Sequence, residues 1–139
     1  LAGWPGELRA RLAGREPGRT TSAAFPAESF AEEVESLFAR GGSRPSYTSL
    51  VPTQLHRVLA DDRATLAAAK FDTILLGGSA ISPALLERAD EHGLSIVRTY
   101  GMSETAGGCV YDGVPFDGVE ITITDTSTID LCGPVVADS

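Results

Sequence analysis

The sequence predicts an α/β fold in which parallel βαβ units with flanking helices are followed by a small antiparallel β segment. Up to Gly107, apolar runs of strand length alternate with helical stretches, which is typical of right-handed βαβ units and a parallel sheet. Beyond that point, short apolar runs are separated only by turn residues, which is typical of antiparallel strands. We therefore expect an α/β part over 1–107 and a β-rich part over 108–139.

Three strands are predicted in the α/β part, and we expect them to be parallel neighbours. They are Tyr47–Val51 (YTSLV), Thr73–Leu76 (TILL) and Ser95–Tyr100 (SIVRTY). Gly77-Gly78 closes the second strand and Gly101 closes the third, because glycine favours the turn that follows a strand.

Helices are predicted between these strands from apolar spacing and from residues that start or stop helices. A short helix is expected over Glu7–Leu12. The later start signals are Pro26, Pro52, Asp61 or Asp62, and Ser82 followed by Pro83, and the stop signals are Gly41-Gly42 and Gly93. The apolar residues expected to face inward are Phe30, Val34, Leu37, Phe38, Leu55, Val58, Leu59, Leu66, Ala69, Leu85, Leu86 and Ala89.

In the β-rich part, the predicted strands are Val110-Tyr111, Val119–Thr124 and Ile129–Cys132. Val119, Ile121 and Ile123 alternate with polar residues, which predicts a half-buried antiparallel sheet. Asp112 and Asp117 each precede a glycine and are predicted to form turns.

Composition narrows the class of protein. The net charge of −8 disfavours a protein that binds a nucleic-acid backbone, since such proteins need a basic surface. The longest apolar runs are far too short to span a bilayer, so no membrane segment is expected. Cys109 and Cys132 do not form a disulfide framework. These features together predict a reduced, cytoplasmic protein.

Two loops are the strongest candidates for a functional site because both follow apolar strands. They are Gly77–Ala80 (GGSA) and Tyr100–Thr105 (YGMSET). Ligands of open parallel sheets bind beyond the carboxyl ends of the strands, so we expect both loops on one rim. Glycines allow a flat ligand to approach the backbone, and the ring of Tyr100 can stack on a base. Ser103 and Thr105 supply hydroxyls, and Glu104 supplies a carboxylate suited to Mg²⁺.

Each of these signals also has a structural interpretation. The Gly-Gly pair is compatible with a plain turn, Tyr100 with a core position, and Ser103-Glu104 with a helix cap and first-turn acid. Other sites are disfavoured, because His56 and His92 have no further metal ligand at helical spacing. The sequence also has no Gly-x-Ser-x-Gly elbow and no Gly-x-x-x-x-Gly-Lys loop.

The loop YGMSET resembles the Tyr-Gly-x-Thr/Ser-Glu signature of the adenylate-forming superfamily of acyl- and aryl-CoA ligases, adenylation domains and luciferases. LLGGSAISPALLERA resembles the Gly-Gly loop and the helix that follows it in that superfamily. Residues 114–121 resemble its downstream Gly-x-Pro segment. Within the superfamily, 47–59 and 98–115 look most like o-succinylbenzoate–CoA ligases of menaquinone biosynthesis.

The resemblance implies an ATP-dependent ligase that uses Mg²⁺, a small carboxylic acid and CoA, and that forms an acyl-adenylate before the thioester. It implies that Gly77, Gly78 and Ser79 lie against adenine and the acyl group. It implies that Tyr100 stacks on adenine, with Gly101, Met102 and Thr105 also at the nucleotide. Ser103 would bond the α-phosphate and Glu104 would hold Mg²⁺, as the two catalytic residues.

Parts of the family pattern are missing from this sequence. The phosphate loop is absent, the C-terminal domain is absent, and Lys70, the only lysine, matches neither family lysine. We therefore expect a partial N-terminal adenylation domain over 1–139 that is inactive alone and self-associates. A ligase for another aryl or fatty acid, and a non-catalytic binding module, are the alternatives.

Overall fold

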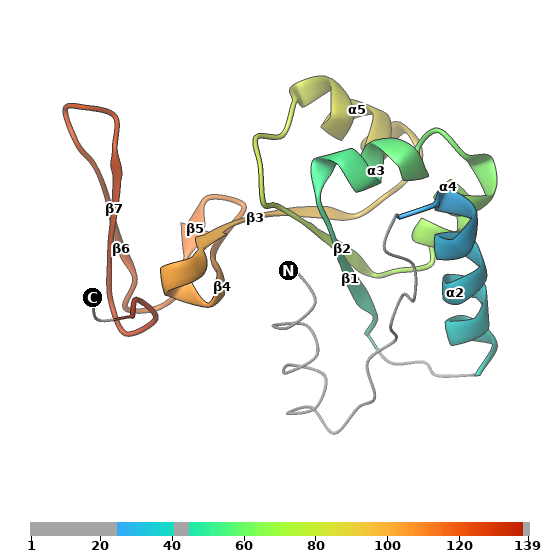
Figure 1. Ribbon diagram of the computed structural model, residues 1–139, viewed down its shortest axis with the longest axis horizontal. Helices are drawn as coiled ribbons and strands as arrows, with labels where there is room; N and C mark the ends of the chain where they lie inside the picture. Colours follow the sequence, from blue (N-terminus) through green and yellow to red (C-terminus); the bar gives the residue numbers. More distant parts are fainter. Residues whose placement is uncertain (1–24, 41–44, 138–139) are drawn as a thin grey trace. The chain divides into compact units, whose positions relative to one another are not determined.

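The computed structural model describes residues 25–40 and 45–137, and the chain divides into two compact units, Leu1–Ile96 and Val97–Ser139 (Figure 1). The expected helix at Glu7–Leu12 and the stop signal at Gly41-Gly42 lie outside the described residues.

The first unit contains parallel strands, as the sequence predicts. Strands β1 (Tyr47–Leu50) and β2 (Thr73–Leu76) pair in parallel, with Tyr47 opposite Thr73 and Leu50 opposite Leu76. The Ile74 amide donates to the Ser95 carbonyl at 2.8 Å, so the chain that enters the third strand also lies beside β2. The predicted α/β architecture is therefore confirmed.

In the described part of this unit, four helices flank the strands: α2 (Ala27–Ala39), α3 (Pro52–Val58), α4 (Asp62–Ala68) and α5 (Pro83–Glu91). Their start signals are confirmed within one residue, since Pro26, Asp61 and Ser82 are N-caps and Pro52 opens α3. Helix α5 ends at Glu91, and Gly93 follows with a φ of 69°.

The buried core is formed by apolar residues from the helices and the two strands. The largest fully buried side chains of this unit are Leu55, Ile74, Leu76 and Val58. Most of the predicted inward residues lie in or against this core, including Phe30, Val34, Leu59, Leu85 and Ala89.

The prediction of an inward position is wrong for three residues, Leu37, Leu66 and Ala69. All three are exposed, and Leu66 is 72% exposed. The buried face of α4 consists of small residues, Ala64, Thr65, Ala67 and Ala68, and this face leaves Leu66 on the outside. In α2, Phe38 rather than Leu37 continues the stripe, with its ring 5.4 Å from that of Phe71.

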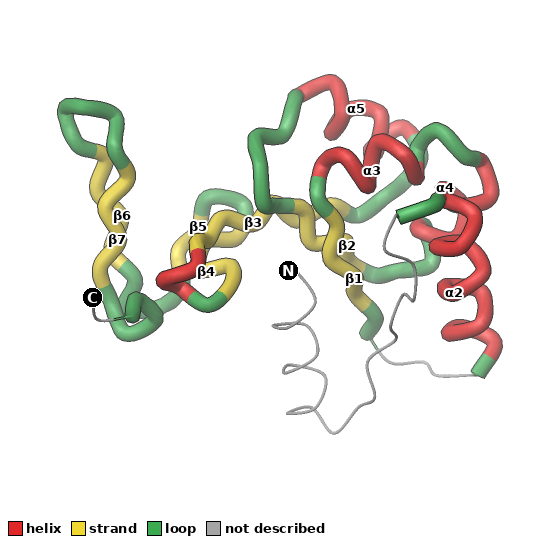
Figure 2. The backbone as a smooth tube through the Cα atoms, viewed as in Figure 1, coloured by secondary structure: helices red, strands yellow, loops and turns green. Residues whose placement is uncertain are grey.

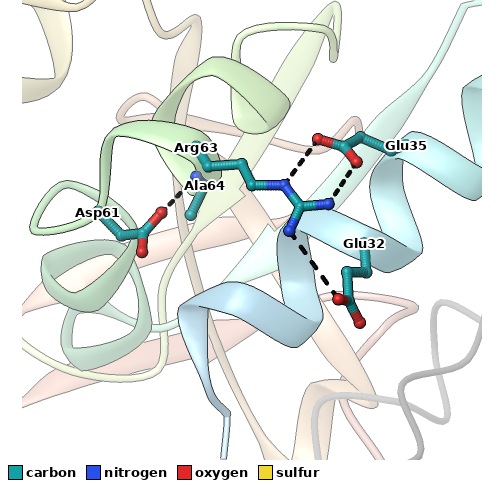
Figure 3. A network of polar contacts seen from close by, with 5 residues as sticks. All are labelled: Glu32, Glu35, Asp61, Arg63 and Ala64. Carbon is teal, nitrogen blue, oxygen red and sulfur yellow. Dashed lines mark hydrogen bonds and ion pairs between the residues drawn. The ribbon is translucent and has the colours of Figure 1, made fainter.

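Polar side chains link α2 to α4 and cap the N-terminus of α4 (Figure 3). Arg63 donates two hydrogen bonds to Glu35, Nε to Oε1 at 3.1 Å and a terminal nitrogen to Oε2 at 2.7 Å. The hydrogen bond lowers the pKa of Glu35 and raises that of Arg63. Both side chains are partly exposed, so this pair orients the helices more than it stabilises them. The Asp61 carboxylate accepts from the Ala64 amide at 2.8 Å.

Asp61→Ala is expected to lower the free energy of unfolding by about 1 kcal/mol, because it leaves a first-turn amide of α4 without its side-chain acceptor. Asp61→Asn keeps an acceptor oxygen and is the matched control. Urea unfolding followed by circular dichroism measures both variants. Equal midpoints for Asp61→Ala and the wild type would show that the cap contributes nothing.

The second unit holds most of β3 (Ile96–Met102), and two further strands extend it as an antiparallel sheet. Strand β4 (Gly107–Tyr111) pairs with β3 and with the short β5 (Val114–Pro115). Gly101 does not close the third strand as predicted, because it pairs with Gly108 and the strand continues to Met102.

Turns at Asp112 and Asp117 are confirmed. Asp112 has a φ of 49°, and its carboxylate accepts from the Arg98 amide at 2.8 Å and from Arg98 Nε at 3.2 Å. Asp117 occupies a turn with Gly118. Cys109 is buried, Cys132 is exposed, and both thiols are free. No helix in the described part of the chain is long and apolar enough to cross a membrane.

Strands β6 (Glu120–Ile123) and β7 (Ile129–Cys132) form a separate two-stranded antiparallel ribbon (Figure 2). Ile123 pairs with Ile129 and Ile121 with Leu131, so four apolar side chains share one face. The expectation of a half-buried sheet holds only for Val119, which is 6% exposed and precedes β6. It is wrong for the paired strands, since Ile123 is 72% exposed and Ile129 40%. Alternation fixes the side of each residue, but a two-stranded sheet supplies no second layer to cover that side.

Candidate functional site

The loop Gly77–Ala80 follows the carboxyl end of β2 in the first unit. The Gly77 amide donates to the Leu50 carbonyl at 3.3 Å, so this loop begins beside the end of β1. Gly78 has a φ of 86°, and a Cβ there would lie 3.2 Å from a methyl of Val51. Ser79 is exposed. Glycine therefore satisfies both the backbone conformation and the close approach to Val51, the N-cap of α3.

The loop at Tyr100–Thr105 belongs to the second unit, whereas Gly77–Ala80 belongs to the first. Each loop has its own geometry, and their expected position on one rim stays a prediction.

The second loop is the tip of the β3–β4 hairpin. Met102 pairs with Gly107, and the residues between them form a single turn of 3₁₀ helix, η1 (Ser103–Thr105), followed by Ala106. Ala106 has a left-handed φ of 51°, and its amide donates to the Ser103 carbonyl at 3.1 Å. This short closed turn presents consecutive side chains at the tip of the hairpin.

Tyr100 and Met102 lie on β3 just before the tip, and they are 38% and 36% exposed. Tyr100 is therefore not a core residue. The pairing shifts between Tyr100 and Gly101, so Cys109 is an extra residue on β4. Bulges of this kind redirect side chains and are frequent beside active sites.

Ser103 and Glu104 are both exposed, and neither side chain has a hydrogen bond or ion pair to the described part of the chain. The N-cap position of η1 is Met102, so Ser103 is not a cap, although Glu104 is an acid in the first turn as the structural interpretation expects. The Glu104 backbone is held in place, because its carbonyl accepts from the Ala137 amide at 2.8 Å. An ordered backbone thus carries a hydroxyl and a carboxylate that are both available to a ligand.

Thr105 differs from these two neighbours because it is only 7% exposed. Its Oγ1 accepts from the Met102 amide at 3.0 Å and lies 2.7 Å from the Gly107 carbonyl and 3.0 Å from that of Met102. This arrangement was not predicted from the sequence. The available signal was a hydroxyl residue three positions after Met102, the spacing at which a side chain reaches back to an N-cap amide.

The tip of the hairpin has the chemistry of a phosphate and divalent-cation site. A hydroxyl can donate to a phosphate oxygen, and a free carboxylate is a hard ligand for Mg²⁺. His92 Nδ1 is 2.8 Å from the Arg88 carbonyl, and no group of three metal-binding side chains occurs within the described residues.

Comparison with known protein families places the chain in a known class. The sequence profile of the AMP-binding enzyme family matches residues 30–139, and the chain belongs to that family.

Particular relatives are more specific. The chain is 41% identical over 138 residues to a probable 2-succinylbenzoate–CoA ligase of Mycobacterium tuberculosis, with 99% of this chain and 35% of the relative aligned. The chain thus spans about a third of the length of that relative.

Solved structures agree with the fold. Escherichia coli MenE with a bound m-phenylether-linked analogue of OSB-AMS is 29% identical, with a TM-score of 0.58 over 75% of this chain and 23% of that one. The o-succinylbenzoate-CoA synthetase MenE of Bacillus subtilis, in complex with the acyl-adenylate OSB-AMP, has a TM-score of 0.69 over 99% of this chain and 31% of that one. The two sequences are only 21% identical, so this likeness concerns the fold alone.

Proposed function

We propose that this chain is part of the N-terminal domain of an ATP-dependent acid–CoA ligase whose acid is 2-succinylbenzoate. The observation that carries the proposal is the exposed Ser103–Glu104 pair at the tip of the β3–β4 hairpin, which has no side-chain partner among the described residues. Membership of the AMP-binding family and the 41% identity to a probable 2-succinylbenzoate–CoA ligase support this choice of reaction and acid.

The reaction has two steps. In the first, a carboxylate oxygen of the acid forms a bond to the α-phosphorus of ATP, and the bond from that phosphorus to pyrophosphate breaks. In the second, the CoA sulfur loses its proton and forms a bond to the acyl carbon, and AMP leaves. The protein contributes by positioning the reactants and offsetting charge, because no covalent protein intermediate is needed.

Backbone and aromatic groups bind the adenine in this proposal. The exposed ring of Tyr100 stacks on the base. Gly101 and Met102 continue the strand past the nucleotide, and Gly77, Gly78 and Ser79 lie against the adenine and the acyl group.

Ser103 and Glu104 act on the phosphates. The Ser103 hydroxyl donates to the α-phosphate, where negative charge develops as pyrophosphate leaves. The residues present fit Mg²⁺, because the Glu104 carboxylate is exposed and has no partner among the described side chains. Mg²⁺ would neutralise phosphate charge when it is bound with ATP.

The proposal is tested by acid-dependent pyrophosphate release from ATP and Mg²⁺, measured on the full-length gene product. We expect 2-succinylbenzoate to give the highest kcat/KM in a panel that includes an aryl acid and a medium-chain fatty acid. Addition of CoA should then yield the thioester. Faster turnover of another acid would show that 2-succinylbenzoate is not the substrate, while the proposed reaction would stand. No acid-dependent release would leave a non-catalytic binding module.

Self-association of the isolated 139-residue chain is a second expected result. The apolar face of the β6–β7 ribbon, formed by Ile121, Ile123, Ile129 and Leu131, is partly exposed, and we propose that the rest of a longer ligase covers it. Without that cover, the apolar face and the outer edges of the two-stranded ribbon favour pairing between copies. The same chain alone should release no pyrophosphate.

Light scattering after size exclusion tests this expectation, at a concentration on the order of tens of micromolar and about 0.15 M salt, where repulsion is screened. Ile123→Thr should reduce the apparent mass, whereas Thr122→Ser on the opposite face should not. A monomer with cooperative unfolding would favour the binding module instead.

A further inference from the structure

We infer that Thr105 is a positioning residue that locks the β3–β4 hairpin tip, rather than a ligand of the nucleotide. The inference rests on the proposed function for its catalytic consequence. Its structural part depends only on the contacts of the Thr105 side chain.

The hydroxyl of Thr105 is already committed within the chain. A threonine hydroxyl has one proton to donate and two lone pairs. One lone pair accepts from the Met102 amide at 3.0 Å, and the proton goes to the Gly107 carbonyl at 2.7 Å, the shorter of two carbonyl contacts. Donation to a phosphate would therefore break the hydrogen bond from Thr105 to Gly107.

The three backbone groups that Thr105 contacts belong to the two ends of the tip. Met102 and Gly107 are the last pair of the β3–β4 ladder, and η1 lies between them. One buried hydroxyl thus joins the residue before Ser103 to the residue after Ala106. The exposed Ser103 and Glu104 project from the segment that this hydroxyl closes.

The remaining geometry of the tip needs such a lock. Ala106 adopts a left-handed conformation, which is unfavourable for a residue with a side chain. Holding Ser103 and Glu104 at fixed positions matters because small displacements of groups that stabilise a transition state reduce the rate steeply. Thr105 would thus affect catalysis through the position of its two neighbours.

Amide hydrogen exchange in the nucleotide-free, full-length gene product tests the structural part. Thr105→Val removes the hydroxyl at nearly constant shape, and we expect exchange at Met102 and 103–106 to speed up by about tenfold. Thr105→Ser keeps the hydroxyl and should retain protection. Thr65→Val is the matched control, because Thr65 is also 7% exposed and its Oγ1 donates to the Val58 carbonyl at 2.8 Å.

Steady-state kinetics of pyrophosphate release test the catalytic part. We expect Thr105→Val to lower kcat by about 10- to 100-fold, with KM for ATP changed by less than about threefold, and Thr105→Ser to restore kcat. A direct ligand would instead leave nucleotide-free exchange unchanged and weaken ATP binding. Should the valine variant not fold, Thr105→Ala removes the hydroxyl without crowding the site.

The two measurements separate this inference from the proposed function. If the wild-type protein has no ligase activity, the proposed function is wrong. Hydrogen exchange would still test whether Thr105 holds the hairpin tip. Wild-type protection in nucleotide-free Thr105→Val, or full kcat in a variant whose tip has lost protection, would overturn the inference.

Discussion

Glu104→Gln in the full-length gene product is expected to slow acid-dependent pyrophosphate release by about two to three orders of magnitude. The substitution keeps the size of the side chain and removes its charge, which is the property that binds Mg²⁺. Because Glu104 is exposed and has no partner among the described side chains, the thermal stability of the variant protein should equal that of the wild type. Rates at saturating ATP and acid, with thermal unfolding in parallel, measure both effects.

Glu120→Gln is the matched control for this experiment, since Glu120 is also an exposed carboxylate of the second unit and lies on β6. It should release pyrophosphate at the wild-type rate. A wild-type rate in Glu104→Gln as well would show that Glu104 has no catalytic role.

Gly101→Ala should have the second large effect. An added Cβ would collide with the Gly107 carbonyl oxygen and lie 2.9 Å from the Gly108 Cα, and both are backbone atoms that cannot move without breaking the β3–β4 pairing. We expect a loss of about 3 kcal/mol in the free energy of unfolding of the second unit. Displacement of the tip should also lower the ligase rate by about a hundredfold.

Gly108→Ala is the control, because a Cβ there would first meet the Tyr111 hydroxyl at 3.0 Å, the far end of a flexible side chain. Its effects should be several times smaller. Protection of β3 and β4 amides and pyrophosphate release measure both variants. Equal behaviour of the two alanine variants would contradict the close backbone approach at Gly101.

The order of elements could be predicted from the sequence because each signal is local. Thr73–Leu76 is a short apolar run bounded by Asp72 and a Gly-Gly pair, and the strand has those same limits. Ser82-Pro83 combines a capping hydroxyl with a residue preset for the first turn, and the Ser82 side chain accepts from the Leu85 amide. Such signals need no knowledge of distant contacts.

Burial was predicted less well because it depends on what packs against an element. Leu66 fits the apolar spacing of α4, yet the smaller face of Ala64, Ala67 and Ala68 is the one that packs inward. Ile123 alternates correctly on β6, yet no layer of the described second unit covers it. Periodicity gives the direction of a side chain and not its neighbours.

At the hairpin tip, the sequence predicted which residues are exposed to a ligand but not how the backbone holds them. Tyr100, Ser103 and Glu104 are exposed as a binding site requires. The extra residue at Cys109 and the inward turn of Thr105 depend on pairing between β3 and β4. That pairing is a tertiary property, which a single loop sequence does not specify.

Nucleotide-dependent protection of the hairpin tip tests the central claim most directly. Hydrogen exchange of the full-length gene product is compared with and without AMP and Mg²⁺. We predict that nucleotide slows exchange in 100–105, and that the Ser103→Ala, Glu104→Gln double variant loses this response while keeping the protection of β1 and β2. Nucleotide-induced protection that is absent from 100–105, or unchanged in the double variant, would contradict the assignment of this loop as the nucleotide site.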